Sequence, residues 1–228
     1  IFSPEHAFDL NYAAGENVLD SEYNNIPIYS LYGENKKPTL NSLTDIDVIL
    51  FDIQDVGVRF YTYISTLHYI MESCAEENIP LIILDRDNLH SNYIDGPVLN
   101  KKFSSFVGMH QVPVVYGMTI GEYALMINGE NWLPNLLTCD LNIIKLKHRD
   151  PFNLNDSVLS HPPSPNLKTN LSIKLYPTLC FFEGSVLSIG RGTDFPFQII
   201  GCPSIKNDFI NELISEKDKY YHFQKHYF

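Results

Sequence analysis

The chain has 228 residues, of which 44% are hydrophobic and 19% charged, and its formal net charge at pH 7 is −11. This length suits one α/β domain with a sizeable core, and the composition excludes a disordered chain. The acidic balance and the lack of a long basic cluster argue against a nucleic-acid surface. No apolar run approaches the ~18 residues that a membrane span needs.

The first half of the chain predicts a βαβ unit. Before it, we expect a strand end at residues 1–2, a strand at residues 26–33 and a short helix near residues 40–43. Apolar runs at residues 48–51 and 81–84 then flank a pattern in which apolar side chains recur every three or four residues. Two short apolar strands around one amphipathic helix predict parallel pairing and burial on both faces.

The second half of the chain is less regular. Thr119 and Glu122 form a T-x-x-E capping box, which predicts a helix that reaches about Asn128. Residues 149–170 are rich in proline and asparagine and predict a long loop. Of the four cysteines, three lie in apolar stretches and are predicted to be buried thiols. The remaining predicted elements are strands at residues 112–116, 141–146 and 198–200 and a closing helix at residues 207–214.

Three charged loops follow predicted strands. Glu5 and His6 follow the first strand, residues 52–59 follow the strand at 48–51, and Asp85 and Arg86 follow the strand at 81–84. In an open α/β sheet, ligands bind at the carboxyl ends of the strands. If the strands are parallel, these loops converge on one rim, where we expect the functional site.

Glu5 is the first candidate for catalysis at this rim. A carboxylate after a strand can simply cap the next helix, because carboxylates favour helix N-termini. Glu5 belongs to no capping box, however, and has His6 beside it. A glutamate in a partly apolar cleft can act as a general acid. Both interpretations of Glu5 stay open on the residues alone.

Asp52 and Asp55 offer a different chemistry, since paired carboxylates at strand ends bind Mg²⁺ in many phosphoryl-transfer enzymes. A metal-dependent phosphatase-type hydrolase is therefore one alternative. The spacing is D-x-x-D rather than the D-x-D of haloacid-dehalogenase-type phosphatases, and no matching lysine motif follows. The chain also contains no nucleotide-binding glycine loop and no G-x-S-x-G elbow.

Arginines form the third group of candidates. Arg59, Arg86 and Arg191 lie in loops that carry glycine or aspartate. The guanidinium group offers two parallel donors to a carboxylate or phosphate, a geometry that lysine does not provide. Each arginine is predicted either to bind an anionic substrate or to pair with a nearby aspartate.

Read together, the motifs of the chain resemble one family. They occur in the order S-P-E-H (residues 3–6), D-I-Q-D-V-G-V-R-F-Y-T-Y (52–63), L-D-R (84–86), P-S-P-N (163–166) and G-R-G-T (190–193). The series resembles the exo-β-N-acetylmuramidases, a glycoside hydrolase family long catalogued as a domain of unknown function. The resemblance covers Phe2 to about Pro203, although Tyr116 stands where the family has a histidine.

This resemblance implies an α/β fold with a Rossmann-like, mostly parallel sheet flanked by helices. It implies a catalytic domain at residues 1–203 and, at residues 204–228, the start of a truncated C-terminal segment, so we expect the chain to be a fragment. The implied activity is release of N-acetylmuramic acid from the non-reducing ends of peptidoglycan fragments, in a periplasmic or secreted location. No cofactor and no metal are implied, and the oligomeric state is left unassigned.

The resemblance also implies roles for residues. Glu5 is expected to be the general acid, with Asp52, Asp55 or the acetamido group of the substrate as the second catalytic group. The arginines are expected to bind the lactyl carboxylate, and Tyr61 with Tyr63 to stack on the sugar. A non-catalytic sugar-binding module remains a further alternative. The expected substrate-binding residues are His6, Gln54, Arg59, Tyr61, Asp85, Arg86, Ser164, Asn166 and Arg191.

Overall fold

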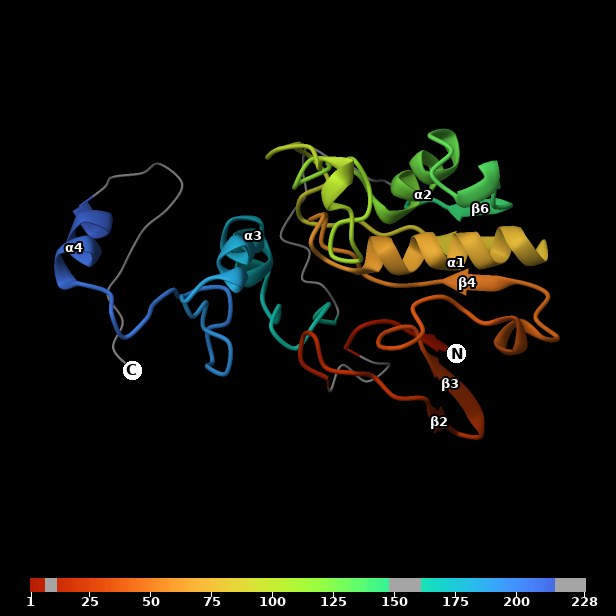
Figure 1. The fold of residues 1–228 in the computed structure, drawn as a ribbon, viewed down its shortest axis with the longest axis horizontal. Coiled ribbons are helices and arrows are strands. Elements are labelled where there is room, and N and C mark those ends of the chain that lie inside the picture. Colours follow the sequence, from red (N-terminus) through yellow and green to blue (C-terminus); the bar gives the residue numbers. More distant parts are fainter. Residues whose placement is uncertain (7–11, 148–160, 216–228) are drawn as a thin grey trace.

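The computed structural model describes residues 1–6, 12–147 and 161–215. Within these ranges the chain forms an α/β fold with two small sheets, each of three strands, and several helices (Figure 1). The Rossmann-like α/β class predicted from the sequence is confirmed. None of the described helices is long and apolar enough to cross a bilayer.

The main sheet contains the predicted βαβ unit. Its strands are β4 (Ile49–Phe51), β5 (Leu81–Leu84) and β6 (Leu141–Ile144), in the order β4-β5-β6, and both pairings are parallel. The prediction that β4 is buried on both faces is wrong. Leu50 is 58% exposed, because its side chain points away from the core that receives its neighbours Ile49 and Phe51. In the described part of the chain, the helices cover one face of this strand.

A second sheet holds β1 (Phe2–Ser3), β2 (Ser21–Tyr23) and β3 (Ile26–Ser30) in the order β1-β3-β2. β1 pairs with β3 in parallel, whereas β2 and β3 form an antiparallel hairpin. Asn24 and Asn25 make the two-residue turn of this hairpin with φ of 51° and 64°. Asparagine tolerates this left-handed backbone, so the Asn-Asn pair is a turn signal that the sequence analysis did not use.

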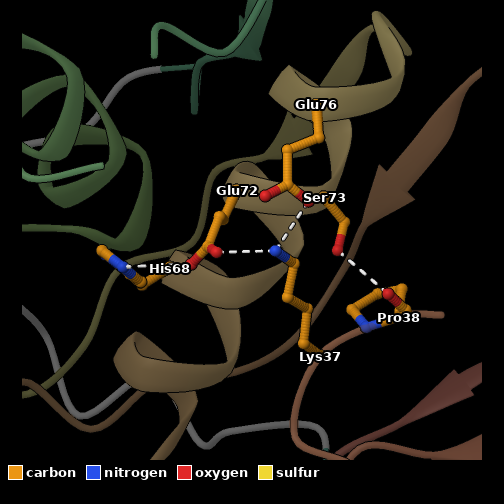
Figure 2. Close-up of polar contacts among 6 residues, drawn as sticks. All are labelled: Lys37, Pro38, His68, Glu72, Ser73 and Glu76. Carbon is orange, nitrogen blue, oxygen red and sulfur yellow. Dashed lines mark hydrogen bonds and ion pairs between the residues drawn. The ribbon is translucent and has the colours of Figure 1, made fainter. Parts of the chain in front are cut away.

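Helix α1 (Tyr63–Glu77) is the crossover of the βαβ unit and lies along β4 (Figure 1). Its apolar side packs on the main sheet, and Asn78, with φ of 56°, ends it in the left-handed conformation. Its other side anchors the loop before η1 (Leu40–Leu43). Lys37 bridges Glu72 and Glu76 at 2.6 Å each, and the Ser73 hydroxyl donates to the Pro38 carbonyl at 3.1 Å (Figure 2).

Helix α2 (Ile120–Gly129) begins with the predicted capping box. The Thr119 hydroxyl accepts from the Glu122 amide, and the Glu122 carboxylate accepts from the Thr119 amide. α2 packs beside α1, and together they close the larger hydrophobic core over β4 and β5. Cys74 and Cys139 are buried in this core and Cys180 is buried elsewhere, which confirms the three predicted buried thiols.

The region between β5 and α2 contains no strand, so the predicted strand at residues 112–116 is wrong. Val115 makes only isolated bridges, to Val58 and Asp95. Pro113 lacks the N–H that a strand ladder needs at that position. Among the described residues beyond β5, the 3-10 turns are η2 (Lys101–Phe103), η3 (Pro134–Leu136) and η4 (Cys180–Gly184).

The C-terminal part of the described chain is helical where the sequence analysis expected little structure. Helix α3 (Asn170–Leu179) was missed, because Pro177 lies within it and its N-terminal box uses Ser172 in place of glutamate. The predicted strand at residues 198–200 is wrong, since only one bridge, Ser188 to Gly201, forms there. The closing helix is confirmed as α4 (Asn207–Ser215). Much of the predicted loop at residues 149–170 lies outside the described residues.

Candidate active site

A pocket of about 390 Å³ opens between the loop after β1, the N-terminal end of α1 and the segment around α3. A second hydrophobic cluster joins the loop after β4 to α3 and contributes Tyr61, Tyr176 and Phe197 to the pocket lining. Six residues predicted to act in catalysis or binding line this pocket: Glu5, His6, Tyr61, Ser164, Asn166 and Arg191. The structure also places in the lining polar residues that the sequence analysis did not single out: Tyr32, Thr62, Tyr176 and Glu183.

Glu5 is the most constrained carboxylate of the pocket, with 7% of its surface exposed. Its Oε1 accepts from the Gly15 amide at 2.9 Å, and its Oε2 accepts from the Thr62 hydroxyl at 2.6 Å. Tyr32 also contacts Glu5, and burial together with this carboxylate raises the pKa of Tyr32 to about 12. The side chain of Glu5 therefore has a fixed orientation toward the pocket.

His6 turns the chain away after β1. Its φ of 75° lies in the left-handed region, which is uncommon for a residue with a side chain and recurs at functional sites. Nδ1 of His6 donates to the Tyr12 carbonyl at 3.0 Å, which leaves Nε2 as the acceptor nitrogen of a neutral ring. Burial lowers the pKa of His6 below its ordinary value, so the neutral ring is favoured at pH 7.

Tyr61 and Tyr63 anchor the proline-rich loop rather than present open ring faces. Both hydroxyls donate to the Pro163 carbonyl, at 2.6 and 3.1 Å. Their rings meet edge to face at 4.6 Å, and Tyr176 packs against Tyr61 at 6.2 Å. This arrangement fixes the loop that carries Ser164 and Asn166. It favours a supporting role for the two tyrosines over the predicted stacking on sugar.

Arg191 and Glu183 form an ion pair in the pocket lining, with 2.7 Å between Nη2 and Oε1. Both side chains are about a third exposed, at 34% and 36%. The guanidinium group also lies over the ring of Phe197, 5.2 Å from its centre. Arg191 is thus a cation held in place yet open to ligand.

Asp52, Asp55 and the remaining predicted residues are absent from this lining. Asp52 pairs with Arg86 on the surface, where the side chains are 42% and 38% exposed. Asp55 is buried and accepts from the Tyr116 hydroxyl and the Gly57 amide. Burial raises the pKa of Asp55 to about 6. The two aspartates therefore have separate structural partners.

Arg59 and Gln54 are committed to backbone carbonyls. Nη1 of Arg59 donates to the carbonyls of Pro97 and Val112, and the side chain is buried. Nε2 of Gln54 donates to Asp55 and Asp87 at 2.9 and 2.7 Å. These contacts tie the loop after β4 to its neighbours. They favour a scaffold role for both residues over the predicted contact with substrate.

Asp85 holds the start of helix α2. It accepts from the Thr119 hydroxyl at 3.0 Å and from the Gly121 amide at 2.9 Å. A carboxylate at a helix N-terminus also interacts favourably with the helix dipole. The predicted rim is therefore divided: Glu5 and His6 belong to the pocket, whereas Asp85 and Arg86 belong to the edge of the main sheet.

This placement of Asp85 predicts a loss of stability without a loss of catalysis. Asp85→Ala should lower the free energy of unfolding by about 1–3 kcal/mol, because two donors at the start of α2 lose their acceptor. Urea unfolding would measure this change. The matched variant Asp52→Ala, which removes only an exposed ion pair, should cost less than about 1 kcal/mol. A KM raised by Asp85→Ala with unchanged stability would instead support the predicted contact with substrate.

No group of three or more His, Cys, Asp or Glu side chains within residues 1–6, 12–147 and 161–215 is arranged to hold a metal ion. Asp52 and Asp55, on which the phosphatase alternative depends, point to different partners. The geometry thus gives the metal-dependent alternative no support.

The fold and the pocket together define a Rossmann-like α/β protein whose candidate active site carries carboxylates and one arginine. The chain belongs to the exo-β-N-acetylmuramidase NamZ family, whose N-terminal family model matches residues 1–171 and whose C-terminal family model matches residues 174–228. The resemblance stated from the motifs is confirmed. The predicted boundary at residues 203/204 stays a prediction.

Individual relatives agree with this assignment. The chain is 42% identical over 220 residues to the peptidoglycan beta-N-acetylmuramidase NamZ of Bacillus subtilis (strain 168), covering 94% of this chain and 52% of that protein. Two crystal structures of DUF1343 family proteins from Bacteroides fragilis NCTC 9343 are also similar. One has a TM-score of 0.79 at 43% identity and the other 0.81 at 35%, covering 90% and 93% of this chain. The chain spans about half the length of these relatives, at 54% and 55% of the two crystallised chains.

Proposed function

We propose that this chain forms the catalytic pocket of an exo-acting glycosidase that releases β-linked N-acetylmuramic acid from the non-reducing ends of peptidoglycan fragments. The observation that carries the proposal is the position of Glu5, which accepts from the Gly15 amide and the Thr62 hydroxyl in a pocket with Arg191. Family membership supports it, since the B. subtilis relative is named a peptidoglycan beta-N-acetylmuramidase. A periplasmic or secreted location follows from such a substrate.

Glu5 is the proposed general acid toward the glycosidic oxygen. One of the two donors to its carboxylate is a hydroxyl group, that of Thr62. A hydroxyl donates to a carboxylate and accepts from a carboxylic acid, so both protonation states of Glu5 keep this hydrogen bond. A carboxyl group that delivers and recovers a proton in each cycle needs this property.

Arg191 is the proposed receptor for the lactyl carboxylate, the group that distinguishes N-acetylmuramic acid from N-acetylglucosamine. Of the three arginines predicted to bind an anion, Arg191 alone is in the pocket lining. Arg59 is buried against backbone carbonyls, and Arg86 pairs with Asp52. His6, Ser164 and Asn166 are the proposed hydrogen-bonding partners of the sugar hydroxyl and acetamido groups.

The test uses the purified chain with two defined disaccharides. A fragment with N-acetylmuramic acid at its non-reducing end should release that sugar, whereas a fragment with N-acetylglucosamine there should stay intact. Activity should be unchanged in EDTA, since the proposed chemistry uses carboxylates alone. Loss of activity in EDTA would support the phosphatase-type alternative, and tight binding of the muramic acid fragment without turnover would support a sugar-binding module.

A further inference from the structure

Hydrolysis of a glycosidic bond by the common mechanism uses two carboxyl groups on opposite sides of the anomeric carbon. Glu5 supplies one of them under the proposed function. The aspartates expected to supply the other are absent from the pocket lining, because Asp52 pairs with Arg86 and Asp55 is buried against Tyr116. The second group is therefore either the acetamido group of the substrate or another carboxylate of the pocket lining.

The described lining contains one carboxylate besides Glu5, and it is Glu183. Glu183 lies in η4, which directly follows α3. Its side chain is 36% exposed, whereas Glu5 is 7% exposed. The two glutamates thus share one pocket but differ in exposure: Glu5 is enclosed, whereas Glu183 is accessible to solvent.

Arg191 holds Glu183 in a fixed orientation. Its guanidinium group donates to Oε1 of Glu183 at 2.7 Å while it lies over Phe197. The turn that carries Arg191 is itself fixed, since the Thr193 amide and hydroxyl both donate to the Gly190 carbonyl, at 3.1 and 2.7 Å. Gly190 has a φ of 82°, and a Cβ there would lie 2.5 Å from the Phe195 carbonyl oxygen, so only glycine fits this turn.

We propose that Glu183 is the second catalytic carboxylate, the general base that activates water against the anomeric carbon, and that Arg191 is its positioning residue. The inference rests on the proposed function. In the reaction, a water molecule transfers a proton to Glu183 as its oxygen bonds to the anomeric carbon. The bond from that carbon to the glycosidic oxygen breaks, and this oxygen takes the proton of Glu5. One water is consumed, and no oxidant or other reactant is needed.

The same ion pair fits the proposed recognition of the lactyl group. The guanidinium group presents five N–H donors in a fork, and the contact with Glu183 uses Nη2. A substrate carboxylate bound by Arg191 would hold the sugar in the part of the pocket that Glu183 lines. The pair thus couples recognition of muramic acid to alignment of the base, which explains why both residues are in one pocket.

Glu183→Gln tests the inference, because it keeps the size of the side chain and removes the basic oxygen. We expect kcat on a chromogenic β-N-acetylmuramide to fall by at least about 100-fold, the usual effect of removing a general base, with thermal stability unchanged. The control Glu130→Gln removes an exposed carboxylate at the end of α2 and should keep wild-type activity. Retained turnover in Glu183→Gln would overturn the inference while leaving the proposed function in place.

Two further measurements separate catalysis from a role in positioning Arg191. If Glu183 only held Arg191 in position for the lactyl carboxylate, Glu183→Gln would raise KM and leave kcat near wild type, and that outcome would overturn the inference. A catalytic base predicts the opposite split, in which kcat falls while KM changes little. A general base also predicts the α-anomer as the first product by NMR, and a β-anomer would overturn the role in activating water. A wild-type chain that binds muramides but releases no sugar would instead overturn the proposed function.

Discussion

Glu5→Gln is expected to abolish the release of N-acetylmuramic acid, with kcat reduced by about 10³-fold or more. The substitution removes the proton that the leaving oxygen must receive, and general acid catalysis by a positioned side chain contributes roughly 10²–10⁴-fold. The amide of glutamine has nearly the shape of the carboxyl group it replaces. It can still contact the Gly15 amide and the Thr62 hydroxyl, which hold Glu5 in the native chain.

The readout should separate catalysis from folding and binding. We expect the thermal midpoint of Glu5→Gln to stay within a few degrees of wild type and KM to change little, while kcat falls. Glu16→Gln is a matched control, since Glu16 is an exposed glutamate close to Glu5 in sequence that accepts from the Ala13 amide. Wild-type kcat in Glu5→Gln would show that another group protonates the leaving oxygen.

The parts of the fold that the sequence predicted correctly are those with strong local signals. Strands β4 and β5 are continuous apolar runs, and α1 repeats apolar residues every three or four positions. The capping box at Thr119 and Glu122 defined the start of α2. The missed helix α3 carries a proline, and its box uses serine, so its local signal conflicts with its structure. There, packing of Ile173 and Tyr176 into the second core outweighs local propensity.

The candidate site was harder to predict because its residues come from distant parts of the chain. Glu5, Tyr61, Ser164 and Arg191 meet in one pocket, and no local pattern encodes that meeting. Composition could not tell that Arg191 lines the pocket while Arg59 does not. The guanidinium group of Arg59 is buried and donates to backbone carbonyls. The signal for Glu183 was an acidic residue beside a glycine, shortly before the Gly-Arg-Gly turn. That signal identifies Glu183 as a candidate only once the structure shows that the turn and η4 line the same pocket.

Acidification is expected to destabilise the protein through a buried histidine pair, His68 of α1 and His110 of the segment before α2. Nε2 of His110 and Nδ1 of His68 are 2.9 Å apart, and Nδ1 of His110 is 2.9 Å from the Tyr123 hydroxyl. His110 also stacks on Trp132, with the ring centres 4.5 Å apart. Burial, followed by the neighbouring charge of His68, lowers the pKa of His110 to about 3. The folded chain therefore holds this ring neutral.

The sign of the effect follows from that shift. An unfolded histidine takes up a proton near pH 6.5, whereas folded His110 does so only near pH 3. Between these values the unfolded state binds more protons, so stability is complete above about pH 6.5 and falls with acidification by about 1.4 kcal/mol per pH unit. Asp55 acts in the opposite direction, because its raised pKa, about 6, stabilises the folded state on acidification. The contribution of His110 must therefore be measured as the difference in stability between wild type and a His110 variant at each pH.

His110→Phe isolates this contribution. The phenyl ring can keep the stack on Trp132 but loses the hydrogen bonds to His68 and Tyr123, so we expect about 1–3 kcal/mol less stability at pH 7. Between pH 6 and 4, the free energy of unfolding in urea should fall with pH more steeply for wild type than for the variant. The difference in slope should be about 1.4 kcal/mol per pH unit. Equal slopes for wild type and His110→Phe would mean that the buried ring takes up its proton without unfolding the core.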